Sequence, residues 1–321
     1  MTISDLAAIS IVTQLPEPPG GWFDYSFTVL MDGNLAIVRT DIDVRTGYLR
    51  WWEQRSENPY AAAPELWNGR IRLSVFDGIS ESHIVEVDSR PHPVVSRLAD
   101  GRWLLAQSRC ERGEGNGHVY DADGLLSASF VFGDGIEHVQ CSPDNTIWVG
   151  YFDEGVFADR LANGRWPVSS GGIVRFSADG VVLWSYNDED HGSGPVDDCY
   201  ALTLDGTIAW SCFYSDFPIA AIDGQTVNLW KNEISGVKAM AVDRDYILLA
   251  GGYRDDAQRI ALVQLGNKES KLFGTLRAPA IHSDAVGLMQ GLGQTLHIVA
   301  DGCWTRLTVA AARAFLVKRQ K

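Results

Sequence analysis

The chain has 321 residues, of which 45% are hydrophobic, and it carries a formal net charge of −14. This apolar fraction is enough to form a core without disulfides or metals as staples. The negative charge excludes a general nucleic-acid binder, because phosphate would be repelled, and it fits either simple solubility or a protein that collects cations.

The N-terminal segment, residues 1–21, has neither a basic region nor an apolar run of the kind that signal peptides carry. No stretch of the sequence approaches the length of a membrane span. The five cysteines are an odd number without metal or redox spacing, which predicts buried thiols in a reducing compartment. We therefore expect a cytoplasmic protein that binds neither membranes nor nucleic acids.

Two kinds of hairpin alternate along the chain. One has a strand, an Asp-Gly-type turn and a second strand, as in residues 28–40 (TVLMDGNLAIVRT) and 139–152 (VQCSPDNTIWVGYF). The other has the same plan, as in residues 173–186 (IVRFSADGVVLWSY). Asp-Gly or Asp-Asn between alternating apolar residues is a strong local hairpin signal.

One hairpin of each kind makes a four-stranded antiparallel meander, and six such meanders predict an all-β, six-bladed β-propeller in a single domain. A single sheet cannot bury both of its apolar faces, whereas sheets stacked in a ring can. The predicted blades cover residues 24–88, 92–132, 136–187, 197–231, 236–277, and 284–310 together with an N-terminal strand at 7–15.

The last blade lacks an obvious fourth strand, and two segments compete to supply it. The N-terminal residues 7–15 (AAISIVTQL) would close the ring with the start of the chain, and residues 314–318 (AFLVK) would close it with the end. We favour the N-terminal strand.

Two insertions interrupt the pattern, one at residues 41–69 in the first blade and a smaller one at 159–172 in the third. Insertions between well-formed strands are often functional loops or lids. Trp51 and Trp52 in the first insertion could be a platform for a sugar or aromatic ligand, or could pin the insertion to the ring. No segment with helical periodicity is evident, which argues against a parallel α/β fold.

Titratable residues recur just before the first strand of each predicted blade, where they would ring one mouth of the central channel. These residues are Asp24, His92, Glu137, His138, Asp197, Asp198, Lys238, and Asp284 near His282. Carboxylates around one axis suit Ca²⁺ or Mg²⁺, and added histidines would allow Zn²⁺. The alternative is a wet channel wall that tolerates polar side chains without binding a metal.

Aromatic and acidic residues follow the second strands and would lie on the same face. They are Tyr151, Asp153 and Glu154 in the third blade, Tyr214 and Asp216 in the fourth, and Tyr253 in the fifth. Together they could wall a pocket around the channel mouth. Alternatively, the aromatics pack between sheets and the acids cap turns.

The segment Asp144–Gly150 (DNTIWVG) resembles the repeat of the NHL propellers, in which a turn precedes an apolar-Trp-Val-Gly strand. The plan of six cycles with acids at the channel mouth resembles the gluconolactonase and senescence-marker lactonase family. That resemblance implies a divalent cation held at the channel mouth by acidic and Asn ligands, and lactone opening. It makes Glu137 and either Asp197 or Asp198 the candidate metal ligands.

Three functions follow from these patterns. The first is a binding module that uses an acidic, aromatic-rimmed pocket at the channel mouth, for a small molecule or a protein partner. The second is a divalent-metal-dependent hydrolase or lyase, with His138 and Asp198 as the catalytic residues. The third is a scaffold for protein assembly that uses the rim.

Overall fold

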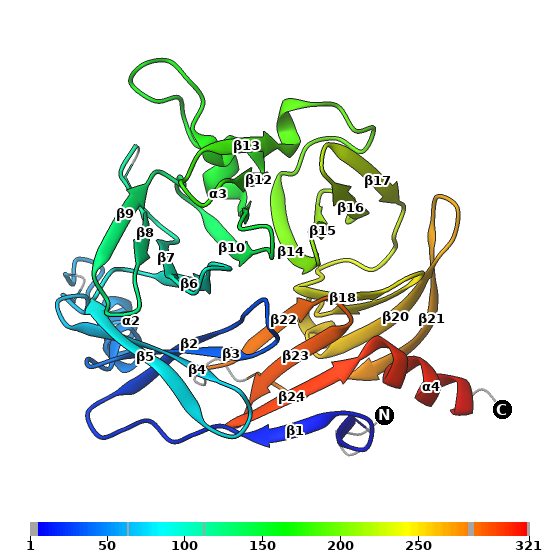
Figure 1. Cartoon of the computed structure of the whole chain (residues 1–321), viewed down its shortest axis with the longest axis horizontal. Helices are drawn as coiled ribbons and strands as arrows, with labels where there is room; N and C mark the ends of the chain where they lie inside the picture. The colour runs from blue at the N-terminus through cyan, green and yellow to red at the C-terminus, as the bar shows by residue number, and fades with distance from the viewer. Residues whose placement is uncertain (1–5, 63, 112, 282–285, 320–321) are drawn as a thin grey trace.

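The computed structural model describes residues 6–62, 64–111, 113–281 and 286–319, and it shows six four-stranded antiparallel sheets arranged around a central axis (Figure 1). The predicted six-bladed β-propeller is therefore confirmed. Each sheet runs outwards from the axis in the order of its strands along the chain, except in the sheet that joins the two ends of the chain.

The strands fall into four concentric sets. The innermost strands are β2 (Phe23–Val29), β6 (Pro93–Arg97), β10 (Ile136–Cys141), β14 (Asp198–Asp205), β18 (Ala239–Asp243) and β22 (Leu288–Leu292). The second strands are β3 (Leu35–Thr40), β7 (Trp103–Gln107), β11 (Ile147–Tyr151), β15 (Ile208–Tyr214), β19 (Tyr246–Ala250) and β23 (Thr295–Ala300).

The third strands are β4 (Arg70–Phe76), β8 (Gly117–Tyr120), β12 (Ile173–Phe176), β16 (Ile219–Asp223), β20 (Arg259–Leu265) and β24 (Cys303–Thr308). The outer strands are β5 (Glu81–Asp88), β9 (Leu126–Phe130), β13 (Val182–Ser185), β17 (Thr226–Trp230), β21 (Ser270–Arg277) and β1 (Ile11–Gln14).

The hairpin β10–β11 shows why the repeat folds in this way. Asn145 adopts a left-handed φ of 64° in the turn, a conformation that Asn tolerates better than most residues. Every residue of β11 is buried, because neighbouring sheets cover both of its faces. The apolar run of a second strand thus supplies core on both sides of its blade.

The ring is closed by the N-terminal strand, as expected. Strand β1 pairs antiparallel with β24, with Ile11 opposite Arg306 and Gln14 opposite Cys303. The competing C-terminal strand is wrong, because this segment forms helix α4 (Val309–Arg319). Ala312 and Leu316 of α4 pack into the core of the last two blades.

Helix α2 (Val44–Glu57) occupies about half of the first insertion, where no helical pattern was expected. Its sequence gives little sign of a helix because Val44 is its only buried residue. A short helix α3 (Asp153–Val156) precedes the second insertion, and a 3-10 turn, η1 (Val168–Gly171), lies at the end of that insertion. Two more 3-10 turns are η2 (Tyr186–Asp188) and η3 (Arg254–Asp256).

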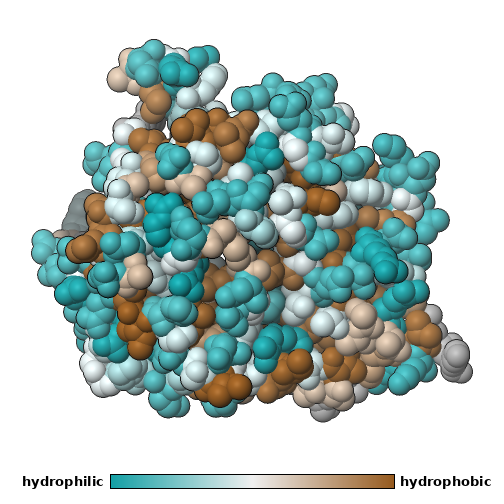
Figure 2. All heavy atoms as spheres, viewed as in Figure 1, coloured by the Kyte–Doolittle hydropathy of each residue, from teal (hydrophilic) through white to brown (hydrophobic). Residues whose placement is uncertain are grey.

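None of the helices in the described residues has the length and hydrophobicity needed to cross a bilayer. The face drawn in Figure 2 is mainly hydrophilic, in keeping with the net charge, with hydrophobic residues gathered over β13. At that place Val181, Val182 and Leu183 are exposed.

Candidate functional site

The channel is narrowed at the end where the first strands finish. The turn after β22 lies across the neighbouring blades: Gly293 donates a backbone hydrogen bond to Leu204 and accepts one from Val242, both at 2.7 Å. A Cβ atom on Gly291 would lie only 1.5 Å from the carbonyl oxygen of Met240, so this close approach requires glycine. A ligand would therefore reach the channel from the opposite mouth, where the first strands begin.

A cavity of about 530 Å³ occupies the channel and is lined by side chains from several blades. Glu137, His138 and Gln140 come from β10, Lys238 directly precedes β18, and Gln290 comes from β22. Glu137 and Lys238 are exposed, whereas His138 and Gln290 are half-buried. This volume is within the range of small-molecule sites.

A β-bulge explains how two consecutive residues of β10 line one cavity. Regular alternation would point Glu137 and His138 to opposite faces of the sheet. The register of β10 against β11 shifts between Ile136 and His138, which turns the strand at this point. Strand β14 has a similar shift between Asp198 and Ala201.

His138 has a defined orientation and protonation state. Its Nε2 lies 3.2 Å from the carbonyl oxygen of Tyr200 on the next blade. Burial lowers the pKa of His138, with Glu137 opposing this effect and Lys238 adding to it. The imidazole is therefore neutral at pH 7, with the proton on Nε2 and an acceptor lone pair on Nδ1.

Asp198 lies at the start of β14 and has an unusually high affinity for a proton. Its pKa is raised to about 6, mainly by burial; Lys238 opposes this effect, whereas Asp153 and Glu137 add to it. A carboxyl group that titrates near neutrality can act as a general acid or base.

Two tyrosines form the aromatic part of the rim near Lys238. The Lys238 ammonium lies 4.3 Å from the ring centroid of Tyr200, a cation–π contact. The Tyr253 hydroxyl donates a hydrogen bond of 2.8 Å to the Tyr200 hydroxyl. Burial is the main cause of the raised pKa of Tyr200, so its hydroxyl stays protonated at neutral pH.

Gln140 presents an acceptor deep in the cavity. Its Nε2 donates a hydrogen bond of 2.9 Å to the carbonyl oxygen of Leu202. Its Oε1 is buried and accepts no hydrogen bond from the described residues. A ligand with an N–H or O–H group could satisfy this oxygen.

His92 lies beside a second pocket rather than in the channel cavity. Its ring stacks on Tyr48 of α2 at a centroid distance of 6.0 Å and packs against Trp67 at 5.6 Å. This pocket has a volume of about 490 Å³ and shares Ser26, Pro93 and Val94 with the channel cavity. The long insertion thus flanks the channel mouth.

Asp24 does not line the channel cavity, contrary to the prediction from its position. Its carboxylate accepts a hydrogen bond of 2.7 Å from Nε of Arg39, which is fully buried and also pairs with Glu81 at 2.6 Å. Burial raises the pKa of Asp24, although Arg39 opposes this effect. Asp24 therefore balances a buried arginine within the first blade.

Tyr151 is not a pocket residue either. It is fully buried, and its hydroxyl donates a hydrogen bond to the carbonyl oxygen of Phe132. This tyrosine belongs to the packing between the second and third blades, the alternative stated for the aromatic residues.

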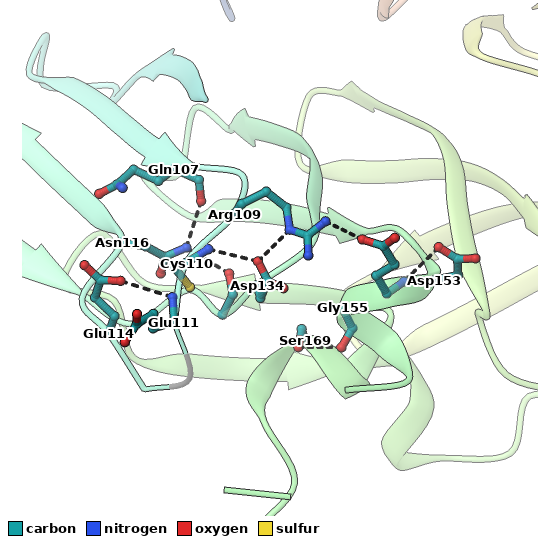
Figure 3. A network of polar contacts seen from close by, with 12 residues as sticks. Gln107, Arg109, Cys110, Glu111, Glu114, Asn116, Asp134, Asp153, Gly155 and Ser169 are labelled. Carbon is teal, nitrogen blue, oxygen red and sulfur yellow. Dashed lines mark hydrogen bonds and ion pairs between the residues drawn. The ribbon is translucent and has the colours of Figure 1, made fainter. Parts of the chain in front are cut away.

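Asp153 and Glu154 begin helix α3 and are both exposed, but they have different neighbours. Arg109 forms one ion pair with Asp134, which Figure 3 shows, and another with Glu154. Asp153 is not part of this pair and instead contributes to the raised pKa of Asp198. Of these two acids, Asp153 is thus the one whose charge affects Asp198 at the channel mouth.

The remaining predicted residues either line neither of these two pockets or lie outside the described part. Asp197 accepts a hydrogen bond of 3.2 Å from Ser215. Tyr214 and Asp216 are exposed and line neither the channel cavity nor the pocket beside α2. His282 and Asp284 lie outside the described residues.

No group of three or more His, Cys, Asp or Glu side chains with a geometry suited to a metal occurs in the part of the chain that the structure describes. Asp153 and Glu137 raise the pKa of Asp198, but the acidic side chains described at the channel mouth do not form a group of this kind. Divalent cation binding therefore stays a prediction.

Sequence reasoning missed three residues of this site, namely Gln140, Tyr200 and Gln290. Each lies inside an ordinary apolar-polar strand pattern, where its side chain looks like any other polar position. For Gln140 and Gln290 a signal was present, because amides on an innermost strand face neighbouring backbones and bond to them.

Residues 173–271 match the model of the family described as "YxzG family", which covers less than one third of the chain. No curated protein matches. The two resemblances noted above thus hold for the six-bladed fold alone. The lactonase activity, which the plan of six cycles implies, stays a prediction.

Among solved structures, the β-propeller domain of Cps50 (Swd1) from Myceliophteria thermophila is 11% identical with a TM-score of 0.49, over 94% of this chain and 99% of that chain. A functionally unknown protein from Desulfotomaculum acetoxidans DSM 771 is 11% identical with a TM-score of 0.49, over 89% and 84% of the two chains. BamB from Moraxella catarrhalis is 12% identical with a TM-score of 0.42, over 93% and 100%. Similarities this low carry no argument about function.

Proposed function

We propose that this propeller binds a small zwitterionic molecule in the acidic, aromatic-rimmed pocket at its channel mouth. The observation that carries the proposal is that Glu137 and Lys238 line one cavity from different blades. Neither takes part in any of the ion pairs found among the described residues. Opposite charges held apart in one pocket match the ammonium and carboxylate groups of a zwitterion.

The other groups of the cavity favour a ligand with hydrogen-bond donors. Gln140 offers a buried acceptor, and the lone pair on Nδ1 of His138 offers another. Near Lys238, the hydroxyl groups of Tyr200 and Tyr253 are joined to each other. These features support an amine or hydroxyl group directed towards β10 and an acceptor group directed towards Lys238.

The proposal is tested with three zwitterions whose charges lie progressively further apart: glycine, γ-aminobutyrate and glycylglycine. Binding is measured by saturation-transfer NMR, with propylamine and propionate as analogues that carry one charge only. We expect at least one zwitterion to bind about tenfold more tightly than either analogue, and Glu137→Gln and Lys238→Met to remove this advantage.

Lys318→Met is the matched control, because Lys318 is an exposed residue in the last turn of α4. It should bind like the wild type. The proposal fails if no zwitterion binds better than the singly charged analogues, or if the control weakens binding as much as Lys238→Met does.

Hydrolysis is the second candidate, favoured by the pKa of about 6 at Asp198 and by the neutral His138 on the neighbouring blade. Such a pair could transfer protons during lactone opening. The test is hydrolysis of γ-butyrolactone by the wild type and by Asp198→Asn. If the protein is a hydrolase of this kind, Asp198→Asn should lower the rate of hydrolysis at least about a hundredfold. Equal rates would contradict this candidate.

A divalent cation held by Glu137 and either Asp197 or Asp198 would accompany that hydrolase activity. Calorimetric titration of EDTA-treated protein with Ca²⁺, Mg²⁺ and Zn²⁺ tests it separately. Binding that is lost in both Glu137→Gln and Asp198→Asn would support the cation, and binding unaltered in both would contradict it.

A further inference from the structure

The pocket beside helix α2 is a built cavity with its own chemistry. Helix α2 supplies Tyr48, Leu49 and Trp52, and the segment before β6 supplies His92. Because this pocket shares lining residues with the channel cavity, it opens at the same face of the ring.

One wall of the pocket is held rigidly by aromatic contacts. The rings of Tyr48 and His92 are inclined by 26° and stacked. The indole N–H of Trp67 donates a hydrogen bond of 3.2 Å to the Tyr48 hydroxyl, and Tyr25 meets Trp67 edge-on at 5.3 Å. A flat surface fixed in this way can receive a planar ring without losing much side-chain entropy.

The backbone of His92 is itself strained to reach this position. Its φ of 50° lies in the left-handed region, which costs a residue with a Cβ about 1 kcal/mol. Such strain tends to be kept where a side chain has a functional placement. The contacts with Tyr48 and Trp67 hold the imidazole there.

The outer wall of the pocket exposes large apolar side chains. Trp52 is 59% exposed and Leu49 is 45% exposed, although both line the pocket. Trp51 has a different role, because its indole N–H donates a hydrogen bond of 3.1 Å to Ala61 and ties the helix to the returning chain. Of the two roles that the sequence left open, Trp51 thus has the structural one, and the ligand platform stays a prediction for Trp52.

The charge of this pocket is opposite to that of the channel mouth. Arg45 lines it, and its lining residues include no Asp or Glu. Arg109 is close enough to lower the pKa of His92, an effect in which burial is the larger cause, so the imidazole is neutral at pH 7. A ligand group directed into this pocket would therefore be neutral or anionic.

We propose that this pocket binds a planar aromatic ring that carries a carboxylate, with the ring against Tyr48, His92 and Trp52 and the carboxylate towards Arg45. The aromatic wall and exposed Trp52 select the flat ring, and Arg45 selects the anion. The inference goes beyond the zwitterion proposal, because it rests on different residues and a pocket of opposite charge.

The experiment uses indole-3-acetate as the probe, with saturation-transfer NMR on the full chain. We expect binding, with Trp52→Ala and Arg45→Gln each weakening it about tenfold or more. Trp166→Ala is the matched control, because Trp166 is exposed to a similar degree, 57%, in the insertion of the third blade. Glu137→Gln should leave indole-3-acetate binding unchanged, which separates this site from the channel.

Two further probes define what would overturn the inference. Indole tests the need for the carboxylate, and methyl glucoside tests a sugar platform in place of an aromatic site. The inference is overturned if indole-3-acetate does not bind, if its binding survives Trp52→Ala, or if methyl glucoside binds more tightly. Because Trp52 is largely exposed, its replacement should not disturb folding, and circular dichroism of the variant checks this.

Discussion

His138 on one blade is joined to Tyr200 on the next by a hydrogen bond of 3.2 Å from its Nε2 to the backbone carbonyl oxygen. Two residues further along the same strand, Gln140 repeats this relationship with Leu202 at 2.9 Å. The third and fourth blades are thus linked by side chains of the channel wall. Because these bonds fix the two side chains, Nδ1 of His138 and Oε1 of Gln140 are the groups left for a ligand.

Replacing Gln140 tests this link. Gln140→Met should lower the free energy of unfolding by about 1–2 kcal/mol, because the buried carbonyl of Leu202 loses its donor. Urea denaturation measures the change, with Gln225→Met in the exposed turn before β17 as the control. If Gln140→Met were as stable as the control, the hydrogen bond between Gln140 and Leu202 would contribute nothing to the free energy of unfolding.

Asp198 should make stability depend on pH in a specific direction. Its pKa of about 6 in the folded protein exceeds its ordinary value of 3.8, so the folded state binds the proton more tightly. This group therefore reduces stability as pH rises from about 4 to 6. Asp198→Asn removes that loss and should be more stable than the wild type at pH 7.5, by about 1 kcal/mol after solvent screening.

The two proteins should differ less at pH 4 than at pH 7.5. Urea denaturation at both pH values measures this, with Asp223→Asn at the exposed end of β16 as the control. If Asp198→Asn were less stable than the wild type at pH 7.5, the proposed environment of Asp198 would be wrong.

The buried arginine of the first blade predicts a large loss of stability. Arg39→Met leaves Asp24 and Glu81 without their partner, and it should cost about 3 kcal/mol or more. Arg72→Met is the matched control, because Arg72 pairs with Glu86 near the surface at 2.6 Å and should cost less than about 1 kcal/mol. Equal losses in thermal or urea denaturation would contradict the structural role given to Asp24.

Tyr151 gives a prediction that separates packing from binding. Tyr151→Phe keeps the buried ring but removes the hydrogen bond to Phe132, and it should cost about 1–2 kcal/mol. Ligand binding at the channel mouth should not change. If Tyr151→Phe weakened zwitterion binding without changing the free energy of unfolding, Tyr151 would instead belong to the binding site.

The fold was predictable because its signals are local. The turn at Asn145 and the buried run of β11 each lie within a few residues, and their repetition reveals the ring. Helix α2 was not predictable in this way, because its stability comes from contacts distant along the chain. A Cβ on Gly47 would lie 2.6 Å from the Leu66 side chain, which shows how closely the returning chain packs on the helix.

The site was predictable in part, for a related reason. Position along a strand placed Glu137 and His138 at the channel, where both line the cavity. The same reasoning failed for Asp24, because the sequence does not show that the side chain opposite, Arg39, is buried and needs a counter-charge. It also could not show that one acceptor of Gln140 receives no hydrogen bond from the residues that the structure describes, which depends on the exact path of the neighbouring blade.

The most direct test of the account is a crystal structure of the protein soaked with whichever of glycine, γ-aminobutyrate and glycylglycine binds most tightly. The account predicts density in the channel cavity, with the ammonium group within hydrogen-bond distance of the Glu137 carboxylate and the carboxylate group beside Nζ of Lys238. A ligand bound elsewhere on the ring, or one in the cavity that contacts neither residue, would contradict it.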